Sequence, residues 1–477
     1  MAMLGKRRPA RPGSGKSGLA RQEKTPPNTS SHSDDRQLTI ERLAHDGRGV
    51  AHWSNGKAVF VDQALPGESV DVAVHRNRKR FDEAHVRERI TSSSQRVSPV
   101  CAHFGRCGGC DLQHMAIDAQ REHKRHVVSE LLARQGLEWP GEIDAIATDE
   151  TAYRRRARLG VNTDRDGNVL MGFRAQRSHR LVDIEQCSVL VPALQALLTP
   201  LRSLLNTLKS PRDVGHIELL ATANQCVVLV RQLSSQPADE QRWQAFADQE
   251  GIALGMMTGR DSAKVQQSGV HWFGAEPVLE DTLALPDAEP LALSFAMGDF
   301  IQVNAAVNQQ MVSRVIDWLA AAKNEQILDL FAGIGNFSLP MAALGAKVHA
   351  VEGNIAMVAR IATNARRHSL PVSGQQADLN TPDSINALLA DIRPDAVILD
   401  PPRSGAEVVC QALGRLAAKA ENSESAPRVA YVSCDPATLA RDAAHLVHGG
   451  YRITQIAVAD MFVHTAHMET LMLLEPT

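Results

Sequence analysis

The alternation of apolar and polar residues changes its character along the chain. Between residues 38 and 90, short alternating runs separated by Gly and Pro-Gly turns are typical of strands in a small OB-like β-barrel. A helical stretch follows at about 116–135. Residues 150–290 mix strands with polar loops, including a basic segment at 153–158. From Gln326 onward, apolar runs alternate with segments of helical periodicity, which predicts a doubly wound α/β domain.

These changes divide the chain into four regions. Residues 1–35 are rich in Pro, Gly, Ser, Lys and Arg and cannot bury enough surface to offset the entropy of ordering. We expect a disordered basic tail there, either a solvated leader or an arm that binds phosphates. We assign the barrel to residues 36–95, a central α+β domain to 96–295 and the α/β domain to 296–477.

Composition supports a multidomain globular protein. The chain has 477 residues, of which 44% are hydrophobic and 22% charged. No apolar run reaches the roughly 18 residues needed to cross a bilayer, and no apolar segment of signal-peptide length follows the first residues. We therefore expect a cytoplasmic protein without membrane contact. In that reducing compartment, seven cysteines do not indicate a disulfide framework. As a separate expectation, the protein is a monomer.

Clustered cysteines between the barrel and the central domain indicate a metal site. Gly108 and Gly109 separate two of the thiols and allow the backbone to fold tightly around one centre. A fourth ligand is expected outside a core strand, whereas Cys226 and Cys410 lie in apolar settings. The candidate ligands are Cys101, Cys107, Cys110 and Cys187. They fit a [4Fe-4S] cluster or a structural zinc ion, and we favour iron-sulfur.

Three polar segments in the C-terminal region each follow a predicted strand. They are Asp-Leu-Phe-Ala-Gly-Ile-Gly-Asn at 329–336, Asp-Pro-Pro-Arg-Ser-Gly at 400–405 and Val-Ser-Cys-Asp-Pro-Ala-Thr-Leu-Ala-Arg-Asp at 432–442. Ligands of doubly wound sheets bind outside the carboxyl ends of the strands. We therefore expect the three segments to form one site.

The first segment predicts a nucleoside pocket. Gly333 and Gly335 permit close approach of the backbone to a ligand at a helix N-terminus. Glu352, at the end of the next strand, is placed to accept hydrogen bonds from two ribose hydroxyls, and Asp378 could contact an adenine edge. The third Gly of a dinucleotide fingerprint is absent, which favours a ligand such as S-adenosylmethionine.

Cys434 and Glu469 are candidates for covalent chemistry. By themselves, Cys434 is equally consistent with a packed core cysteine and Glu469 with an exposed strand residue. A thiolate that adds to C6 of uracil activates C5 toward a sulfonium methyl group, and a base must then remove the C5 proton. Together the two side chains could supply that thiolate and that base.

The segments around these residues resemble the RNA uracil-C5-methyltransferases throughout the catalytic half, including His-Thr-x-His-x-Glu at 464–469. The barrel resembles a TRAM domain, and with Cys-x5-Cys-Gly-Gly-Cys it is similar to the bacterial branch that acts on 23S ribosomal RNA. The resemblance implies a Rossmann-like methyltransferase domain, S-adenosylmethionine and a [4Fe-4S] cluster as cofactors, and 23S ribosomal RNA as partner. A uridine in tRNA or at another ribosomal site is the alternative substrate.

The resemblance also implies individual roles. Cys434 is the expected nucleophile and Glu469 the expected base. The residues expected to contact the target base are Phe300, by stacking, Gln302 and Asp400. Those expected around the adenosylmethionine are Gln302, Phe331, Asn336, Glu352, Asp378 and Asp400. The family often has Asn where this chain has Asp435, and can have Asn at the position of Asp378.

Two other functions compete with this interpretation. An amino-methyltransferase of the Asp-Pro-Pro-aromatic type would act without a covalent step, but Arg403 stands where the aromatic residue is needed. A noncatalytic RNA-binding or zinc-dependent assembly protein would leave Cys434 and Glu469 incidental. For the catalytic interpretation we expect the uridine to be flipped into the pocket while the barrel and the cysteine domain bind the surrounding RNA.

Overall fold

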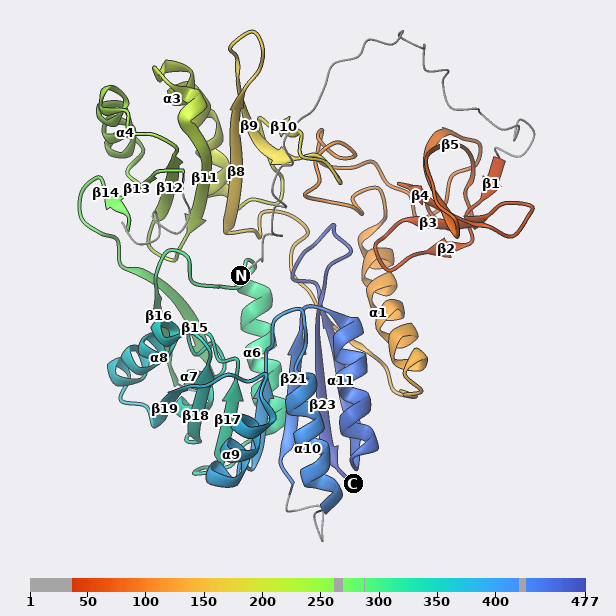
Figure 1. Cartoon of the computed structure of the whole chain (residues 1–477), viewed down its shortest axis with the longest axis vertical. Coiled ribbons are helices and arrows are strands. Elements are labelled where there is room, and N and C mark those ends of the chain that lie inside the picture. The colour runs from red at the N-terminus through yellow and green to blue at the C-terminus, as the bar shows by residue number, and fades with distance from the viewer. Residues whose placement is uncertain (1–36, 261–268, 287, 420–425) are drawn as a thin grey trace, which may run out of the picture.

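The computed structural model describes residues 37–260, 269–286, 288–419 and 426–477. The expected basic tail lies outside the described residues. The described chain forms three bodies, a barrel-like N-terminal sheet, a central sheet with helices and a C-terminal sheet with helices (Figure 1). No helix within the described ranges is long and apolar enough to span a membrane.

The N-terminal body is a six-stranded sheet in the order β1-β5-β6-β4-β3-β2. Inward-facing residues such as Val59, Val61 and Val72 are buried and alternate with more exposed neighbours, as the period of a half-buried strand requires. The strands are β1 (Gln37–Thr39), β2 (Arg42–Leu43), β3 (Gly49–His52), β4 (Ala58–Asp62), β5 (Ser69–Asn77) and β6 (Phe81–Arg89). The predicted helix after it is confirmed as α1 (Ile117–Arg134).

The central body is a seven-stranded sheet in the order β10-β9-β8-β11-β12-β13-β14. Apolar residues of β8, β11 and β12 form one core cluster with residues of helices α3 and α4. The basic segment at 153–158 is not wholly a loop, because β8 begins at Arg156. The elements are β8 (Arg156–Thr163), β9 (Val169–Arg174), β10 (Leu181–Asp183), α2 (Pro192–Ala196), α3 (Leu198–Thr207), η1 (Pro211–Asp213), β11 (Val214–Ala221), β12 (Cys226–Gln232), α4 (Pro237–Glu250), β13 (Ala253–Thr258) and β14 (His271–Trp272).

The C-terminal body is an eight-stranded sheet in the order β19-β18-β17-β20-β21-β23-β22-β7. The strands from β19 to β21 are parallel and β23 is antiparallel to β21. The elements are α6 (Ala305–Leu319), β17 (Gln326–Leu330), α7 (Ser338–Ala343), β18 (Lys347–Glu352), α8 (Ile355–Arg367), β19 (Val372–Gln376), α9 (Pro382–Ile392), β20 (Ala396–Leu399), α10 (Glu407–Lys419), β21 (Arg428–Ser433), α11 (Pro436–His448), β22 (Tyr451–Ala459) and β23 (Glu469–Pro476).

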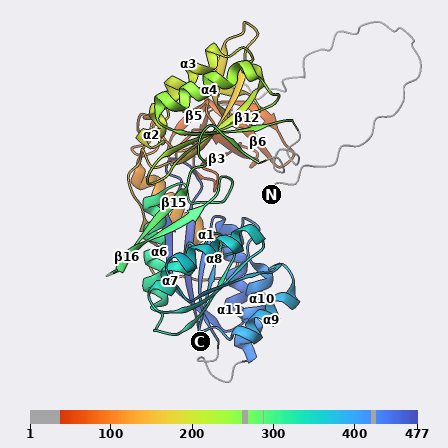
Figure 2. The ribbon, with the colours of Figure 1, turned by 90° about the vertical axis from the view of Figure 1, so that its left-hand side faces the viewer.

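Three segments from earlier in the chain pack onto the C-terminal sheet. Strand β7 (Asp144–Ile146) pairs with β22 at the sheet edge. Val128 and Leu132 of α1 join one of its apolar clusters, and the hairpin of β15 (Leu279–Leu285) and β16 (Ala288–Phe295) joins the other. Figure 2, turned by 90°, shows this hairpin between the central sheet and the C-terminal body. The C-terminal body therefore includes segments that lie before residue 296 in the chain.

A close backbone approach fixes α11 against α10. Gly414 of α10 lies so near α11 that a Cβ built on it would stand 2.7 Å from the carbonyl oxygen of His445. Gly449 lies at the end of α11, and a Cβ there would stand 2.3 Å from the Cα of Gly414. Only glycine permits this spacing. The position of α11 in turn places the third polar segment, because residues 436–442 of that segment form the first turns of the helix.

We expect Gly414→Ala to destabilise the protein although alanine favours helices by about 1 kcal/mol. The added methyl group forces α10 and α11 apart, which costs about 1–3 kcal/mol of unfolding free energy. Urea denaturation measures the change. The exposed neighbour Arg415→Ala should change stability by less than about 0.5 kcal/mol, and an unchanged or more stable Gly414→Ala protein would contradict the packing argument.

Candidate active site

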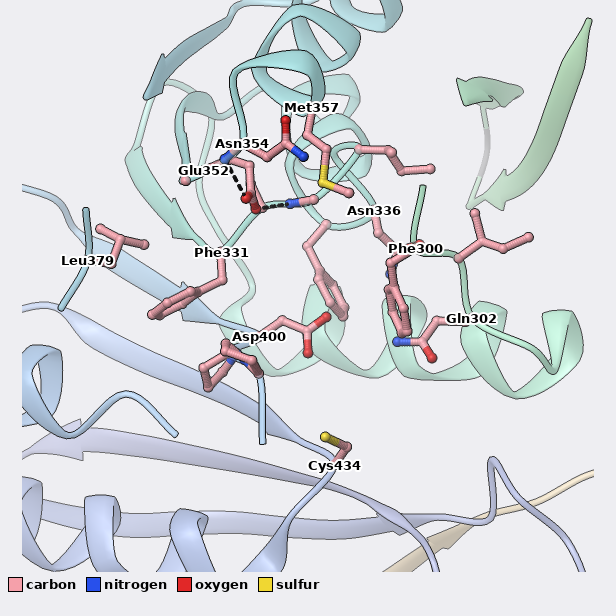
Figure 3. A pocket seen from close by; sticks show the side chains of 18 of the residues that line it. Phe300, Gln302, Phe331, Asn336, Glu352, Asn354, Met357, Leu379, Asp400 and Cys434 are labelled. Atoms are coloured by element: carbon pink, nitrogen blue, oxygen red, sulfur yellow. Dashed lines mark hydrogen bonds between the residues drawn. The ribbon is translucent and has the colours of Figure 1, made fainter. Parts of the chain in front are cut away.

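A single cavity of about 980 Å³ lies at the carboxyl ends of the parallel strands. Segments following β17, β18, β19, β20 and β21 contribute to its wall, together with residues just before α6. All nine residues predicted for the cofactor, the target base and the chemistry line it, namely Phe300, Gln302, Phe331, Asn336, Glu352, Asp378, Asp400, Cys434 and Glu469. Figure 3 labels these residues except Asp378 and Glu469. The structure thus brings the predicted residues together, while their roles stay predictions.

Left-handed backbone shapes the loop after β17. Phe331, Gly333 and Gly335 have φ angles of +64°, +59° and +93°. The turn points the Gly333 N–H at Glu352, whose Oε2 accepts it at 3.1 Å, while Oε1 accepts the N–H of Asn354 at 3.0 Å (Figure 3). Two backbone donors therefore fix the Glu352 carboxylate at the cavity wall, with lone pairs left for a ligand.

Two sets of polar contacts stabilise the loop after β17. Asp329 is fully buried and accepts a hydrogen bond from the Ser338 hydroxyl, and burial raises its pKa to about 7. Asn336 and Asn308 of α6 exchange a reciprocal pair of amide hydrogen bonds at 2.9 and 3.0 Å. Asn308 was not predicted, because an Asn within a helical pattern carries no signal of its partner.

An arginine of the central body anchors the segment with Phe300 and Gln302. The Arg155 Nε donates to the carbonyl oxygen of Gln302 at 2.8 Å, and its terminal nitrogens pair with Asp281 at 2.6 and 2.5 Å. The Gln302 side chain is 6% exposed, and its Oε1 accepts no hydrogen bond from any described residue. Phe300 is 63% exposed. The cavity wall thus has one buried acceptor without a partner among the described residues and one exposed aromatic ring.

Strand register places Cys434 beside Glu469. The antiparallel pairing of β21 with β23 ends at Ser433 opposite Thr470, so the next residues in each direction are Cys434 and Glu469. Opposed residues of such a pair have Cα atoms about 4.5–5.5 Å apart. Figure 3 shows the Cys434 side chain pointing from the end of β21 toward the cavity. The two groups come together because β21 ends and β23 begins at the same level of the sheet.

Asp435, one of the departures from the family pattern, caps α11. Its Oδ1 accepts the N–H groups of Ala437 at 3.0 Å and Thr438 at 3.3 Å. Asp and Asn are equally good N-caps, and a negative charge is favourable at a helix N-terminus. The extra charge relative to Asn therefore has a local use beside Cys434.

Burial dominates the electrostatics of the cavity. It raises the pKa of Cys434 to about 11, assisted by the negative charges of Glu469 and Asp400 and opposed by Arg403. Burial, then the charge of Asp400, raises the pKa of Glu469 well above its ordinary value, again opposed by Arg403. The pKa of Asp400 rises to about 7 through burial and the charge of Asp329. A pKa of about 11 favours the thiol form of Cys434 over the thiolate at neutral pH.

The loop that carries Arg403 is held by α11. The Asp442 carboxylate accepts the Ala406 N–H and the Tyr431 hydroxyl, both at 2.7 Å, and Arg441 donates to the Ser404 carbonyl at 2.9 Å. The second and third polar segments are therefore one hydrogen-bonded unit. Arg403 was noted in the sequence only as a mismatch to another methyltransferase class, and its electrostatic role was missed.

The four candidate cysteine ligands also come together. Cys101, Cys107, Cys110 and Cys187 line one cavity of about 310 Å³. Gly108 allows close contact here, since a Cβ on it would lie 3.0 Å from the Arg174 carbonyl oxygen. Burial, with the charges of the other thiols, raises the pKa of Cys110 to about 12. Within the described ranges, no three Cys, His, Asp or Glu side chains are close enough to hold a single metal ion.

Comparison with protein families gives two matches. The model described as tRNA (Uracil-5-)-methyltransferase matches residues 116–370 and 382–477. The TRAM domain model matches residues 35–86. The second match confirms the predicted TRAM-type barrel.

Curated relatives match along nearly the whole chain. A 23S rRNA (uracil(1939)-C(5))-methyltransferase RlmD from Halomonas elongata is 51% identical, covering 100% of this chain and 97% of its own length. The protein of the same name from Chromohalobacter salexigens is 50% identical over 99% of this chain and 96% of its own. That from Shewanella piezotolerans is 40% identical over 95% of this chain and 98% of its own.

Among solved structures, the tRNA (uracil-54, C5)-methyltransferase of Pyrococcus abyssi, in complex with S-adenosyl-L-homocysteine, has a similar fold. The TM-score is 0.69 with 22% identity, covering 92% of this chain and 100% of that one. The predicted Rossmann-like methyltransferase fold is confirmed.

The raised thiol pKa predicts how Cys434 reacts in the absence of substrate. Only the thiolate is alkylated, so the rate with iodoacetamide should rise about tenfold per pH unit toward the pKa, which is about 11. In Arg403→Met the opposing positive charge is gone, the pKa rises further and alkylation at pH 8 slows. Mass spectrometry of the Cys434 peptide measures the rate. Arg415→Met, on the exposed side of α10, is the control, and equal or faster labelling of Arg403→Met would refute the assignment.

Proposed function

The chain belongs to the tRNA (uracil-5-)-methyltransferase family, and we propose that it transfers a methyl group from S-adenosylmethionine to C5 of a uridine in 23S ribosomal RNA. The observation that carries this proposal is the position of Cys434 and Glu469 directly beyond the last register pair of β21 and β23, in the same cavity as the fixed carboxylate of Glu352. A nucleophile, a base and a site for a nucleoside are what this reaction needs.

In the proposed reaction, the Cys434 thiol first loses its proton to solvent, the thiolate sulfur forms a bond to C6 of the uracil, and the C5–C6 π electrons move to give an enolate across C4 and C5. C5 then takes the methyl group of the sulfonium, and S-adenosylhomocysteine leaves. Glu469 removes the remaining C5 proton, the electrons re-form the C5–C6 double bond and the C6–S bond breaks. Cys434 returns as a thiolate. The raised pKa of Glu469 suits a carboxylate that must accept a proton.

Residues beside the cavity support recognition of a flipped base. Phe300, exposed at 63%, offers an aromatic face on which an unstacked uracil can stack. Oε1 of Gln302 accepts no hydrogen bond from described residues and can accept one from the uracil N3–H. Asp378, Phe331 and Asn336 line the same cavity as Glu352, beside which we place the adenosine.

The choice of 23S ribosomal RNA rests on the full-length relatives and on the TRAM match, while the solved structure of similar fold is named for tRNA. A uridine in tRNA, or elsewhere in ribosomal RNA, is the alternative. A noncatalytic RNA-binding role would not account for a nucleophile and a base paired in the cavity. The expected monomeric state stays a prediction.

The covalent step can be trapped with 5-fluorouridine, because fluorine at C5 cannot be removed by a base. We expect a 5-fluorouridine-substituted 23S ribosomal RNA fragment, with S-adenosylmethionine, to form a complex that survives denaturing electrophoresis. Cys434→Ala should form none. A 5-fluorouridine-substituted tRNA, run in parallel, tests the alternative substrate.

Cys226→Ala is the control, because this thiol lies in β12 of the central body and does not line the cavity. It should trap RNA as the unmodified protein does. Trapping that persists in Cys434→Ala, or no trapping with any RNA, would contradict the mechanism. Trapping of the tRNA alone would move the substrate to the alternative.

We also propose that the four cysteines hold a [4Fe-4S] cluster. The four thiols line one cavity of about 310 Å³, and three of them lie within residues 101–110. Cysteine thiolates hold iron-sulfur clusters, and a [4Fe-4S] cluster takes four of them. When bound, it would supply a rigid cross-link between residues 101–110 and Cys187, and no step of the reaction is assigned to it.

Protein purified without oxygen should be brown and absorb at about 400 nm, where iron-sulfur charge transfer lies. Cys187→Ala should lose most of that absorption, whereas Cys226→Ala should keep it. Metal analysis provides the second measurement. A colourless protein with one zinc per chain would overturn the cluster in favour of zinc.

A further inference from the structure

The position of Glu469 depends on the loop that precedes it. Strand β22 ends at Ala459, and Ala459 is the register partner of Glu469 at the start of β23. The nine residues 460–468 therefore leave and re-enter the sheet at the level of the catalytic carboxyl, and we call them the β22–β23 loop. Any shift of this loop moves the first residue of β23.

A buried lysine of α1 grips the beginning of this loop. Lys124 is 0% exposed, and its Nζ lies 2.6 Å from Oδ1 of Asp460 and donates to the Phe462 carbonyl at 3.2 Å. Arg121, one turn earlier on α1, lies 3.3 Å from the other Asp460 oxygen and also donates to the Thr148 carbonyl. Figure 1 shows α1 running beside α11, with which it is in contact. One ammonium group thus fixes two points of the loop.

Further contacts hold the middle of the loop from the same side. The Tyr153 hydroxyl donates to the Val463 carbonyl at 3.1 Å. The backbone N–H groups of Asp111 and Leu112, directly after Cys110, both donate to the His464 carbonyl at 2.9 Å. His464 has a φ of +66°, a conformation that costs energy for a residue with a side chain. The loop therefore keeps its shape through contacts with α1 and the cysteine segment.

Stability alone does not account for the ion pair. Two charges lose their hydration on burial, and well-packed apolar residues of similar volume often give equal or greater stability. The ion pair instead fixes geometry, because an ammonium group with three donors determines where Asp460 and the Phe462 carbonyl lie. Cys434, at the end of β21, makes none of these contacts. Loss of the pair would therefore displace Glu469 and leave the nucleophile in place.

We propose that Lys124 and Asp460 are positioning residues for Glu469, and that they act on proton abstraction from C5 rather than on thiol addition or methyl transfer. The inference rests on the proposed function. A base displaced by about 1 Å can cost about 100-fold in its step. The intermediate that precedes the step, methylated at C5 and still joined through C6 to Cys434, should then accumulate.

The test uses the full-length protein, an unmodified 23S ribosomal RNA fragment with ordinary uridine, and S-adenosylmethionine with a radiolabelled methyl group. In Lys124→Met we expect a labelled protein–RNA complex that survives denaturing electrophoresis, with release of methylated RNA slowed by about 100-fold. The unmodified protein should release its RNA and show little complex. Glu469→Gln should accumulate the same complex and is the positive control.

Arg125→Met is the matched control, since Arg125 is a neighbouring cation of α1 that pairs with Glu122 on the same helix. It should turn over normally. The double variant Lys124→Met/Asp460→Leu removes the unpaired buried carboxylate that could unfold the single variant. We expect it to melt close to the unmodified protein and still accumulate the complex.

The outcomes separate the inference from the proposed function. Normal turnover in Lys124→Met or in the stable double variant overturns the positioning role. So does a loss of activity without labelled complex, because a merely structural defect slows all steps together. If Glu469→Gln itself accumulates no complex while fluorinated RNA is trapped, the role of Glu469 fails instead. If neither RNA is trapped by any variant, the proposed function fails.

Discussion

The arrangement of the site depends on where hydrogen-bonded strands end. Leu330, Leu399 and Tyr431 are register partners across β17, β20 and β21, so the residues that follow these strands emerge at one edge of the sheet. A shift by one residue in any pair would turn each side chain of that strand to the other face. Cys434 and Glu469 meet for the same reason, although their strands run in opposite directions. The chemistry is thus specified first by backbone pairing and only then by side chains.

Three carboxyl groups lie at that edge, and burial disfavours their ionised forms. Burial raises the pKa of Asp329 and Asp400 to about 7 and that of Glu469 well above its ordinary value. For a carboxyl whose pKa is higher in the folded than in the unfolded protein, the folded state binds the extra proton. The contribution of this proton binding to the stability of the fold is therefore lost as pH rises from the pKa of the unfolded state through the pKa of the folded state. A cavity that buries these carboxyl groups therefore weakens the fold as pH rises through their raised pKa values, which is the expected conflict between function and stability.

Much of this site could be predicted from the chain, because its parts carry local signals. The glycines in the loop after β17 indicate a backbone shape. The carboxylate at the end of β18 and the closely spaced cysteines each indicate a type of ligand. Arg155 and Lys124 carry no such signal. A run of arginines indicates a solvated surface, and a lysine in the polar helix α1 is expected in water, yet both are buried by partners more than a hundred residues away. Their roles depend on tertiary contacts that no short window of sequence contains.

The front half of the chain consequently makes direct contacts with the candidate active site. Arg403 lines both the catalytic cavity and the cysteine cavity, and Phe462, Thr465 and His467 of the β22–β23 loop line the latter. Asp111 and Leu112 bind the same loop through its His464 carbonyl. The β22–β23 loop leads directly into Glu469, so contacts of the cysteine segment and α1 with this loop affect the position of Glu469. Cys434 and the Glu352 carboxylate lie at the ends of sheet strands and make none of these contacts. Under the proposed roles, the nucleophile is held at the end of β21, whereas the base is held both by its register in β23 and by this loop, so a change in the front half would act on the base first.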